Sequence, residues 1–275
     1  MRRAVRVVAL LALALLLVGL GACALKRPSH ERRWAPEQAV LPHVEIDGDT
    51  VRIANVRNFT WTSAERFTPR YEERVYDLDL LDRVWYVVSP LSEDWRGLAH
   101  TFLTFGFADS QYVSLSVEAR RERDEVYAPV KGALRAFELM VVIGDERDVL
   151  GLRAVTWNTP TYLYPGRATP AQVRELFVTM LRRAQAVERR PEFYHTLSNN
   201  CTTNILEAVN EVREEPIPYG LRVLLPGYSD ELAYEQGLID TDLPLDSARA
   251  AFRINARAAA AWGAPDFSSR LRQPG

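Results

Sequence analysis

The sequence predicts a single α+β domain in which an antiparallel sheet packs against helices. β-rich segments are concentrated between residues 45 and 143, whereas the clearest helical periodicity begins after residue 168. No internal repeat is present. The chain has 275 residues, of which 47% are hydrophobic, and this is enough to bury one sizeable core.

The first 23 residues predict export and lipid attachment. Three arginines within the first six residues precede an apolar run over 7–18, which is too short to span a bilayer comfortably. The run leads to the lipobox-like sequence Leu-Gly-Ala-Cys, so residues 1–22 are expected to be a lipoprotein signal peptide and Cys23 the site of lipid attachment. An ordinary signal peptide with an incidental cysteine is the alternative. Ala24 is not aspartate, which favours a lipid-anchored location on the periplasmic side of the outer membrane.

Residues 23–44 are polar and are expected to form a lipid-anchored tether, followed by one periplasmic domain over 45–265. Loss of the signal peptide would leave 31 basic and 36 acidic residues. This weakly acidic balance argues against binding to nucleic acid.

Alternating and β-rich segments predict the strands of the sheet. The two central segments should form a hairpin, because residues 108–110 (Ala-Asp-Ser) provide a short turn between them. The globular region begins near residue 45. The predicted strands cover residues 50–53, 80–88, 98–107, 112–120 and 134–143.

Three helices are expected in the second half of the chain. Thr169, Pro170 and Gln172 form a capping signal, and a stripe of apolar residues then repeats at helical spacing until Pro191. A second helix should run from Cys201 to about Val212, and an alanine-rich helix should lie over 248–261.

Cys201 is the strongest candidate for chemistry. If Cys23 carries lipid, the only other cysteine of this exported chain has no intramolecular partner. Asn199 and Asn200 predict a helix cap, so Cys201 falls in a first turn where the helix dipole and free N–H groups favour a thiolate and can hold an oxyanion. The alternative, a small buried thiol with no reactive role, is less favoured.

A thiol nucleophile of this kind needs a base. His30 and His43 lie in or near the predicted tether, whereas His100 opens the first hairpin strand and His195 lies six residues before Cys201.

The hairpin register would place His100 opposite Glu118, which could then hold the imidazole in one tautomer. Glu118 could equally be an exposed carboxylate that pairs with Arg120 or Arg135. Arg120 and Arg121 could contact a substrate phosphate, although a solvated charge pair is the more common role for such residues.

Five motifs give the chain a resemblance to the Lnb N-terminal periplasmic domain family over about residues 45–265. They are NVRNF at 55–59, HTFLTFGF at 100–107, SVEARRE at 116–122, FYHTLSNNCTTN at 193–204 and LPGYS at 225–229. The family resembles the permuted branch of the NlpC/P60 papain-like superfamily, in which the histidine strand precedes the cysteine helix. The resemblance therefore implies a permuted papain-like fold in which the catalytic cysteine lies at the start of a packed helix.

The family's namesakes are lipoprotein N-acyltransferases that work through a thioester on the catalytic cysteine. By resemblance, Cys201 would be the nucleophile, His100 the base and Glu118 the orienting residue. The family more often has asparagine at the position of His195, so this residue would at most assist or contact substrate. The namesakes also carry additional membrane-spanning sequence, which this chain lacks.

These observations predict a thiol-dependent acyltransferase that is anchored to the membrane by its lipid and acts on a phospholipid or a lipoprotein through an acyl-cysteine. A cysteine hydrolase or peptidase of the cell envelope and a non-enzymatic envelope lipoprotein are the alternatives. No cofactor is expected. Metal catalysis is disfavoured because no pair of histidine and acidic residues shows ligand spacing.

Overall fold

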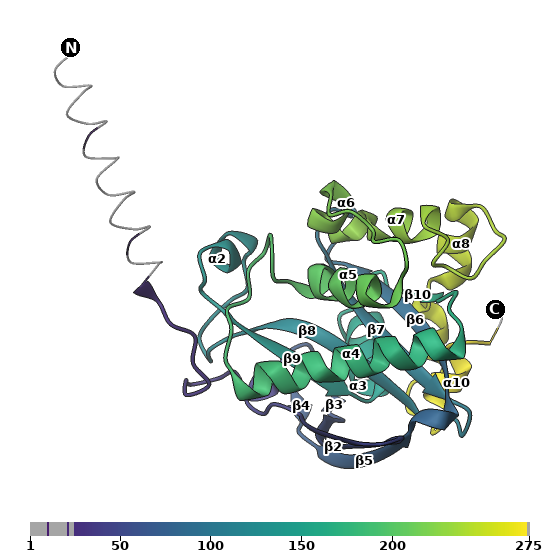
Figure 1. The fold of residues 1–275 in the computed structure, drawn as a ribbon, viewed down its shortest axis with the longest axis horizontal. Coiled ribbons are helices and arrows are strands. Elements are labelled where there is room, and N and C mark those ends of the chain that lie inside the picture. Colours follow the sequence, from purple (N-terminus) through teal and green to yellow (C-terminus); the bar gives the residue numbers. More distant parts are fainter. Residues whose placement is uncertain (1–9, 11–20, 22–24, 274–275) are drawn as a thin grey trace.

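The computed structural model describes Leu10, Gly21 and residues 25–273 (Figure 1). The predicted lipid-attachment site, Cys23, lies outside the described residues, and so does the predicted signal peptide apart from Leu10 and Gly21.

An eight-stranded sheet forms the centre of the domain, with the strand order β1-β2-β9-β8-β7-β6-β10 and with β5 paired to β2. All its pairs are antiparallel except β2 with β9. The predicted α+β class with a mostly antiparallel sheet is therefore confirmed. Its strands are β1 (His43–Asp47), β2 (Thr50–Arg57), β5 (Tyr71–Asp77), β6 (Leu81–Pro90), β7 (Ala99–Phe107), β8 (Tyr112–Arg120), β9 (Glu138–Gly144) and β10 (Tyr162–Pro165); β3 (Thr60–Trp61) and β4 (Phe67–Thr68) form a separate pair.

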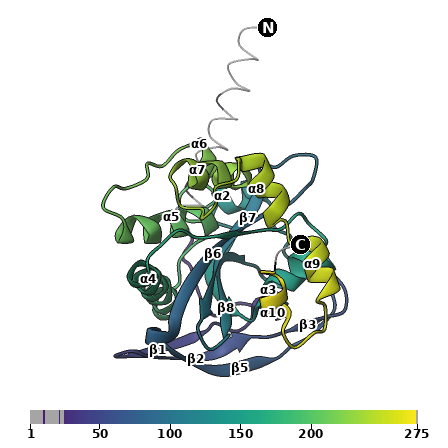
Figure 2. The ribbon, with the colours of Figure 1, turned by 90° about the vertical axis from the view of Figure 1, so that its right-hand side faces the viewer.

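Helices cover both faces of this sheet (Figure 2). The long helices α4 (Pro170–Arg189) and α5 (Cys201–Val212) pack on one face. The other face is covered by α3 (Glu146–Gly151), the π-helix Leu152–Thr156, α9 (Asn255–Ala260) and α10 (Phe267–Arg270). The remaining helices are α2 (Pro129–Ala133), α6 (Leu221–Leu224), α7 (Ser229–Glu235), α8 (Leu245–Phe252) and the 3₁₀ turns Pro36–Gln38, Leu78–Leu80 and Pro226–Tyr228.

Strand β7 is buried on both faces, and its alternation divides the core into two parts. Leu103, Phe105 and Phe107 pack toward α4 and α5. Phe102 lies in the core of the opposite face together with Met140. Each β7 side chain can therefore contact only the layer of helices that covers its own face of the sheet.

The first two of the three predicted helices are confirmed. The Thr169 side chain accepts a hydrogen bond from the backbone N–H of Gln172, whose side chain in turn caps Thr169, and α4 ends at Arg189. Helix α5 spans Cys201 to Val212 as predicted.

Two other predicted segments are shorter than expected. Strand β9 begins at Glu138 rather than at residue 134, because the chain turns over residues 134–137 after the short helix α2. The C-terminal alanine-rich segment forms α8 and α9, which are separated at Arg253 and Ile254.

Residues 29–42 pack against the domain instead of forming a free tether. Arg32 forms an ion pair with the buried Glu138 at 2.6 Å, and the Trp34 ring lies 4.0 Å from the guanidinium of Arg120. Gln38 is buried and donates to the carbonyl of Ala119. The polar composition of this segment suggested exposure, but its polar groups find buried partners on β8 and β9.

Candidate active site

Cys201 is the first residue of α5 and is only 4% exposed. Asn200 caps the helix: its side-chain oxygen accepts from the backbone N–H groups of Thr202 at 2.9 Å and Thr203 at 3.0 Å. The Thr203 hydroxyl accepts from the Asn200 N–H, which completes a capping box. None of the described residues accepts a hydrogen bond from the N–H of Cys201 itself. One helix-terminal donor is thus left beside the thiol.

Asn199 and Asn200 build the start of the helix with their side-chain amides. Asn200 donates to the carbonyl of Thr196, and Asn199 donates to Glu192 and to the carbonyl of Phe193. Because these N–H groups are engaged, the backbone N–H of Cys201 is the better placed donor for an oxyanion in this region.

His100 and Glu118 lie together on the sheet, with Ser116 between them. His100 Nε2 lies 2.6 Å from the Ser116 hydroxyl, which donates to Glu118 Oε1 at 3.0 Å, and Nε2 lies 3.7 Å from that oxygen. Because the hydroxyl proton is directed at the carboxylate, the serine oxygen accepts from Nε2–H. This network assigns the proton to Nε2 and leaves the lone pair on Nδ1.

The electrostatics of this group fix its charge state. Burial and the nearby Arg153 lower the pKa of His100 to about 3, against the opposing effect of Glu118. Burial alone would raise the pKa of Glu118, but Arg153, at 3.1 Å, and His100 lower it to about 2. At neutral pH the structure therefore holds a neutral imidazole beside an ionised carboxylate.

No hydrogen bond joins His100 to Cys201, although β7 and the start of α5 are in contact. Their neighbours do meet: the hydroxyls of Thr101 and Thr202 lie 3.0 Å apart. Thr101 faces α5, however, whereas the His100 ring shares the opposite face with Phe102. Within the described part of the chain, the Cys201 sulfur has one hydrogen-bond partner, the Thr202 hydroxyl at 3.7 Å.

The sheet opens at this point. Strands β7 and β8 are paired only from Leu103 to Gly106, with partners Leu115 to Tyr112, so they separate toward His100. The imidazole thus lies beyond the paired part of β7 and β8, at the end of β7 that contacts the start of α5.

A largely apolar cavity begins one residue beyond the thiol. It runs between α4, α5, β6 and α7, and its polar groups include the hydroxyls of Tyr86 and Ser229, which lie 2.6 Å apart. Along α5 its wall consists of Thr202, Ile205, Leu206 and Val209.

The remaining candidate residues have other contacts. Arg120 is 3% exposed and donates to the carbonyls of Gln38 and Ala39, so it secures the N-terminal segment. Arg121 pairs with Glu37 at 2.6 Å.

His195 is bridged through its backbone to Asn199, and its ring contacts the Ser198 hydroxyl. Glu118 pairs with Arg153, which is neither of the two arginines that the sequence offered as partners.

Two residues at this site were missed by sequence reasoning. Ser116 could have been found, since its spacing of two from Glu118 places both on one face of β8. Arg153 could not, because it arrives from the π-helix on a different layer and no local pattern predicts that contact.

Two further properties concern the described residues as a set. None of their histidine, cysteine, aspartate and glutamate side chains gather in a group suited to hold a metal ion. No helix within residues 25–273 has both the length and the apolar character needed to span a bilayer.

Fold and site together define an α+β domain that carries an unpaired, buried thiol at the start of a packed helix. The family model of the Lnb N-terminal periplasmic domain matches residues 67–227, which is more than half of the chain. The chain therefore belongs to the Lnb N-terminal periplasmic domain family, which points to a periplasmic envelope protein. Neither a curated protein nor a solved structure matches it significantly.

Proposed function

We propose that this protein is a thiol-dependent acyltransferase of the periplasmic side of the envelope, which acts on a phospholipid or a lipoprotein. The observation that carries the proposal is the position of Cys201, at a capped helix start and one residue from an apolar cavity. We further propose that Cys23 is lipidated, that the protein lies at the outer membrane, and that the fold is the permuted papain-like fold.

In the first half-reaction, His100 Nδ1 takes the proton of the Cys201 thiol, and the sulfur attacks the ester carbonyl of a phospholipid. The C–O bond then breaks, the departing alkoxide takes the proton from the imidazolium, and a thioester remains on Cys201. The backbone N–H of Cys201 stabilises the oxyanion, because no described residue competes for it.

In the second half-reaction, an amine attacks the thioester. Its proton passes through His100, the C–S bond breaks, and the thiol of Cys201 is restored as an amide forms on the acceptor. Glu118 and Ser116 keep the imidazole proton on Nε2, so that Nδ1 acts as the base in both steps. The step requires His100 and Cys201 to approach each other where the pairing of β7 with β8 has ended.

The apolar cavity supports an acyl chain as the transferred group. Its walls along α5 are aliphatic, and burial of each methylene of an acyl chain against such walls contributes about 0.8 kcal/mol. A cell-wall peptide, with its many polar groups, would leave hydrogen bonds unmade in this cavity.

The test uses the full-length protein in phospholipid vesicles, with phospholipid labelled in its acyl chains and a diacylated lipopeptide that carries a free N-terminal amine. We expect label first on Cys201, in a hydroxylamine-sensitive bond, and then on the amine. Cys201→Ala should abolish both. Release of free fatty acid without labelled lipopeptide would instead identify a hydrolase, and absence of label on Cys201 would overturn the proposed mechanism.

Substitutions of two histidines, His100 and His195, test which residue acts as the base. His100→Ala should slow alkylation of Cys201 by iodoacetamide at neutral pH, whereas His195→Asn should leave it unchanged. An equal effect of the two substitutions would remove His100 from its proposed role.

A further inference from the structure

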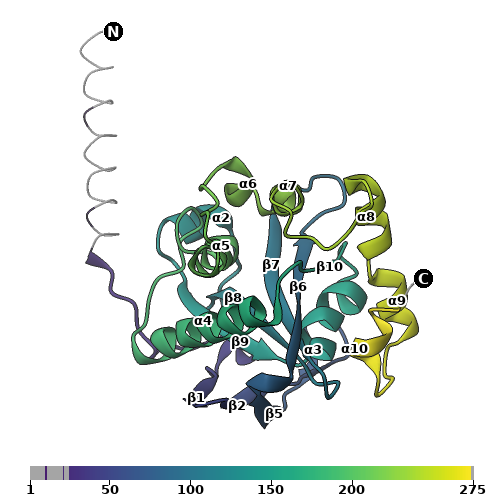
Figure 3. The ribbon, with the colours of Figure 1, turned by 45° about the vertical axis from the view of Figure 1, so that its right-hand side comes forward.

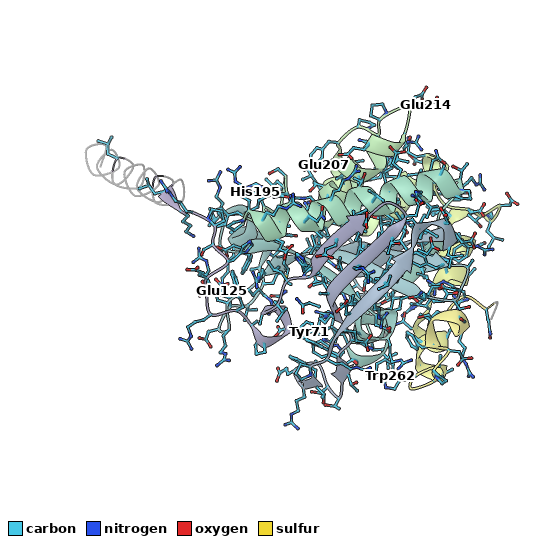
Figure 4. The ribbon with its side chains drawn as sticks, turned by 60° about the horizontal axis from the view of Figure 1, so that its bottom comes forward. Tyr71, Glu125, His195, Glu207, Glu214 and Trp262 are labelled. Carbon is cyan, nitrogen blue, oxygen red and sulfur yellow. The ribbon has the colours of Figure 1, made fainter. Side chains whose placement is uncertain are left out.

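A cluster of exposed apolar side chains lies where the described chain begins. Val126, Val130 and Leu134, on and beside α2, are 73%, 71% and 51% exposed, and Leu197 on the neighbouring loop is 51% exposed. We define these four residues as the α2 surface. Figures 1 and 3 show α2 at the end of the domain from which the N-terminal segment leaves. Glu125 directly precedes Val126, and His195 lies two residues before Leu197. Figure 4 shows both of them at that end of the domain and Trp262 at the other end.

The N-terminal segment ties the predicted anchor to this surface. The Lys26 ammonium donates to the carbonyl of Leu134 at 3.5 Å, and the N–H of Ser29 donates to Glu138 at 3.2 Å. The first of these contacts is at Lys26, and the three residue steps from Lys26 to Cys23 reach at most about 10 Å. A lipid on Cys23 would therefore hold α2 against the bilayer.

The charges around the α2 surface fit a membrane of anionic phospholipid. Residues 126–136 contain the exposed Lys131 and Arg135 and no acidic residue, whereas Asp124 and Glu125 precede Val126. Lys26 and Arg27, at the start of the described segment, are also exposed. Basic side chains that surround apolar ones are the composition of surfaces that lie in the headgroup region, where apolar side chains enter the acyl boundary.

We propose that the α2 surface docks on the bilayer and orients the domain upon it. The inference rests on the proposed lipidation of Cys23, and it specifies which face of the domain contacts the bilayer. A lipid on one residue fixes a distance from the membrane but no orientation, and the apolar side chains of the α2 surface supply the second contact.

This orientation bears on the proposed chemistry because α2 is built onto the start of α5. The Thr196 hydroxyl donates to the carbonyl of Pro129 at 2.7 Å, and Asn200, the cap of α5, donates to the carbonyl of Thr196 at 2.6 Å. Two hydrogen bonds thus connect the docking helix to the residue that precedes Cys201. The docked surface brings the thiol to the side of the domain from which a phospholipid enters.

The experiment compares two labelled positions in the full-length, lipidated protein. Val130→Cys carries an environment-sensitive dye on α2, and Val75→Cys carries it on β5, where Val75 is 45% exposed at a distant edge of the sheet. Both are made with Cys201→Ser, so that the dye has one target. Vesicles contain phosphatidylethanolamine, phosphatidylglycerol and a lipid with a nitroxide in its upper acyl chain.

We expect the dye at residue 130 to be quenched at least twofold more than the dye at residue 75. Equal quenching, or none at residue 130 in protein that floats with the vesicles, would overturn the docking surface and leave the lipid anchor intact. Shielding of the dye at residue 130 without vesicles would show that a second copy covers α2. Protein that neither floats nor carries lipid on Cys23 would overturn the anchor and the docking surface together.

Discussion

Replacing Ser116 with alanine removes the hydroxyl that joins the His100 ring to the Glu118 carboxylate. Ser116 is fully buried and makes hydrogen bonds of 2.6 and 3.0 Å to these two groups. Without it, the imidazole N–H faces a carboxylate oxygen at 3.7 Å, beyond hydrogen-bond distance. A buried donor left without its partner costs about 1–3 kcal/mol, and the lost bond to the carboxylate adds about 1 kcal/mol.

The chain provides a matched control two residues away. Ser114 lies on the same face of β8 and is equally buried, but its hydroxyl finds no hydrogen-bond partner in the described part of the chain. Ser114→Ala removes a buried polar group that gains nothing in the folded state, so it should leave the free energy of unfolding unchanged or raise it. The two variants should thus differ by at least about 2 kcal/mol.

Urea unfolding followed by tryptophan fluorescence measures this difference, and the pH dependence of Cys201 alkylation supplies a second readout. Loss of the preferred tautomer in Ser116→Ala should slow alkylation about tenfold at neutral pH, a fraction of the 10²–10⁴ that a positioned base contributes. Ser114→Ala should alkylate as the parent does. Equal stability and equal alkylation of the two variants would refute the connection of His100 to Glu118 through Ser116.

Two further predictions concern pH and packing. The pKa of His100, about 3 in the folded protein, lies below its unfolded value of 6.5, so the unfolded chain binds more protons and stability should fall as pH drops below 6.5, by up to about 1.4 kcal/mol per pH unit. Glu118 adds to this loss below its unfolded pKa of 4.5, and urea unfolding at pH 5 and 7 should show a much smaller change in His100→Asn than in the parent. Gly227→Ala should destabilise by about 1–3 kcal/mol, because an added Cβ would lie 1.3 Å from the carbonyl oxygen of Arg96. Gly220→Ala, with open space around the new methyl group, should not; equal melting temperatures would contradict the packing argument.

Much of the fold could be predicted because its signals are local. The capping box of Thr169 and the asparagine cap before Cys201 are short-range hydrogen-bond patterns, and both helices begin where these patterns place them. The turn at 108–110 fixed the hairpin register, and Thr104 pairs with Ser114 as that register requires. His100 Nε2 and Glu118 Oε1 also lie 3.7 Å apart, although the pairing of β7 with β8 ends before these residues.

The features that were missed depend on contacts between distant segments. The N-terminal segment reads as a polar linker, yet Arg32 and Gln38 are held by groups more than 80 residues away. Residues 134–137 continue an apolar pattern, but the chain turns there, and Arg135 adopts a positive φ of 54°. Local propensity predicts neither the packing of the N-terminal segment nor the turn at 134–137, because both depend on contacts with distant parts of the domain.

The split between the two faces of β7 constrains how the proposed chemistry can proceed. Arg153 holds Glu118 ionised from the face opposite α5, while the thiol belongs to α5. His100 and its partner Glu118 lie on one face of the sheet, whereas Cys201 lies on the other. His100 can therefore reach the thiol only beyond the paired part of β7 and β8, which ends before His100. The low pKa of His100 in this state also makes it a weak proton acceptor, so approach of the thiol must lessen its burial or supply a negative charge. A thiolate beside the imidazole supplies that charge, so close approach of the two groups itself favours proton transfer.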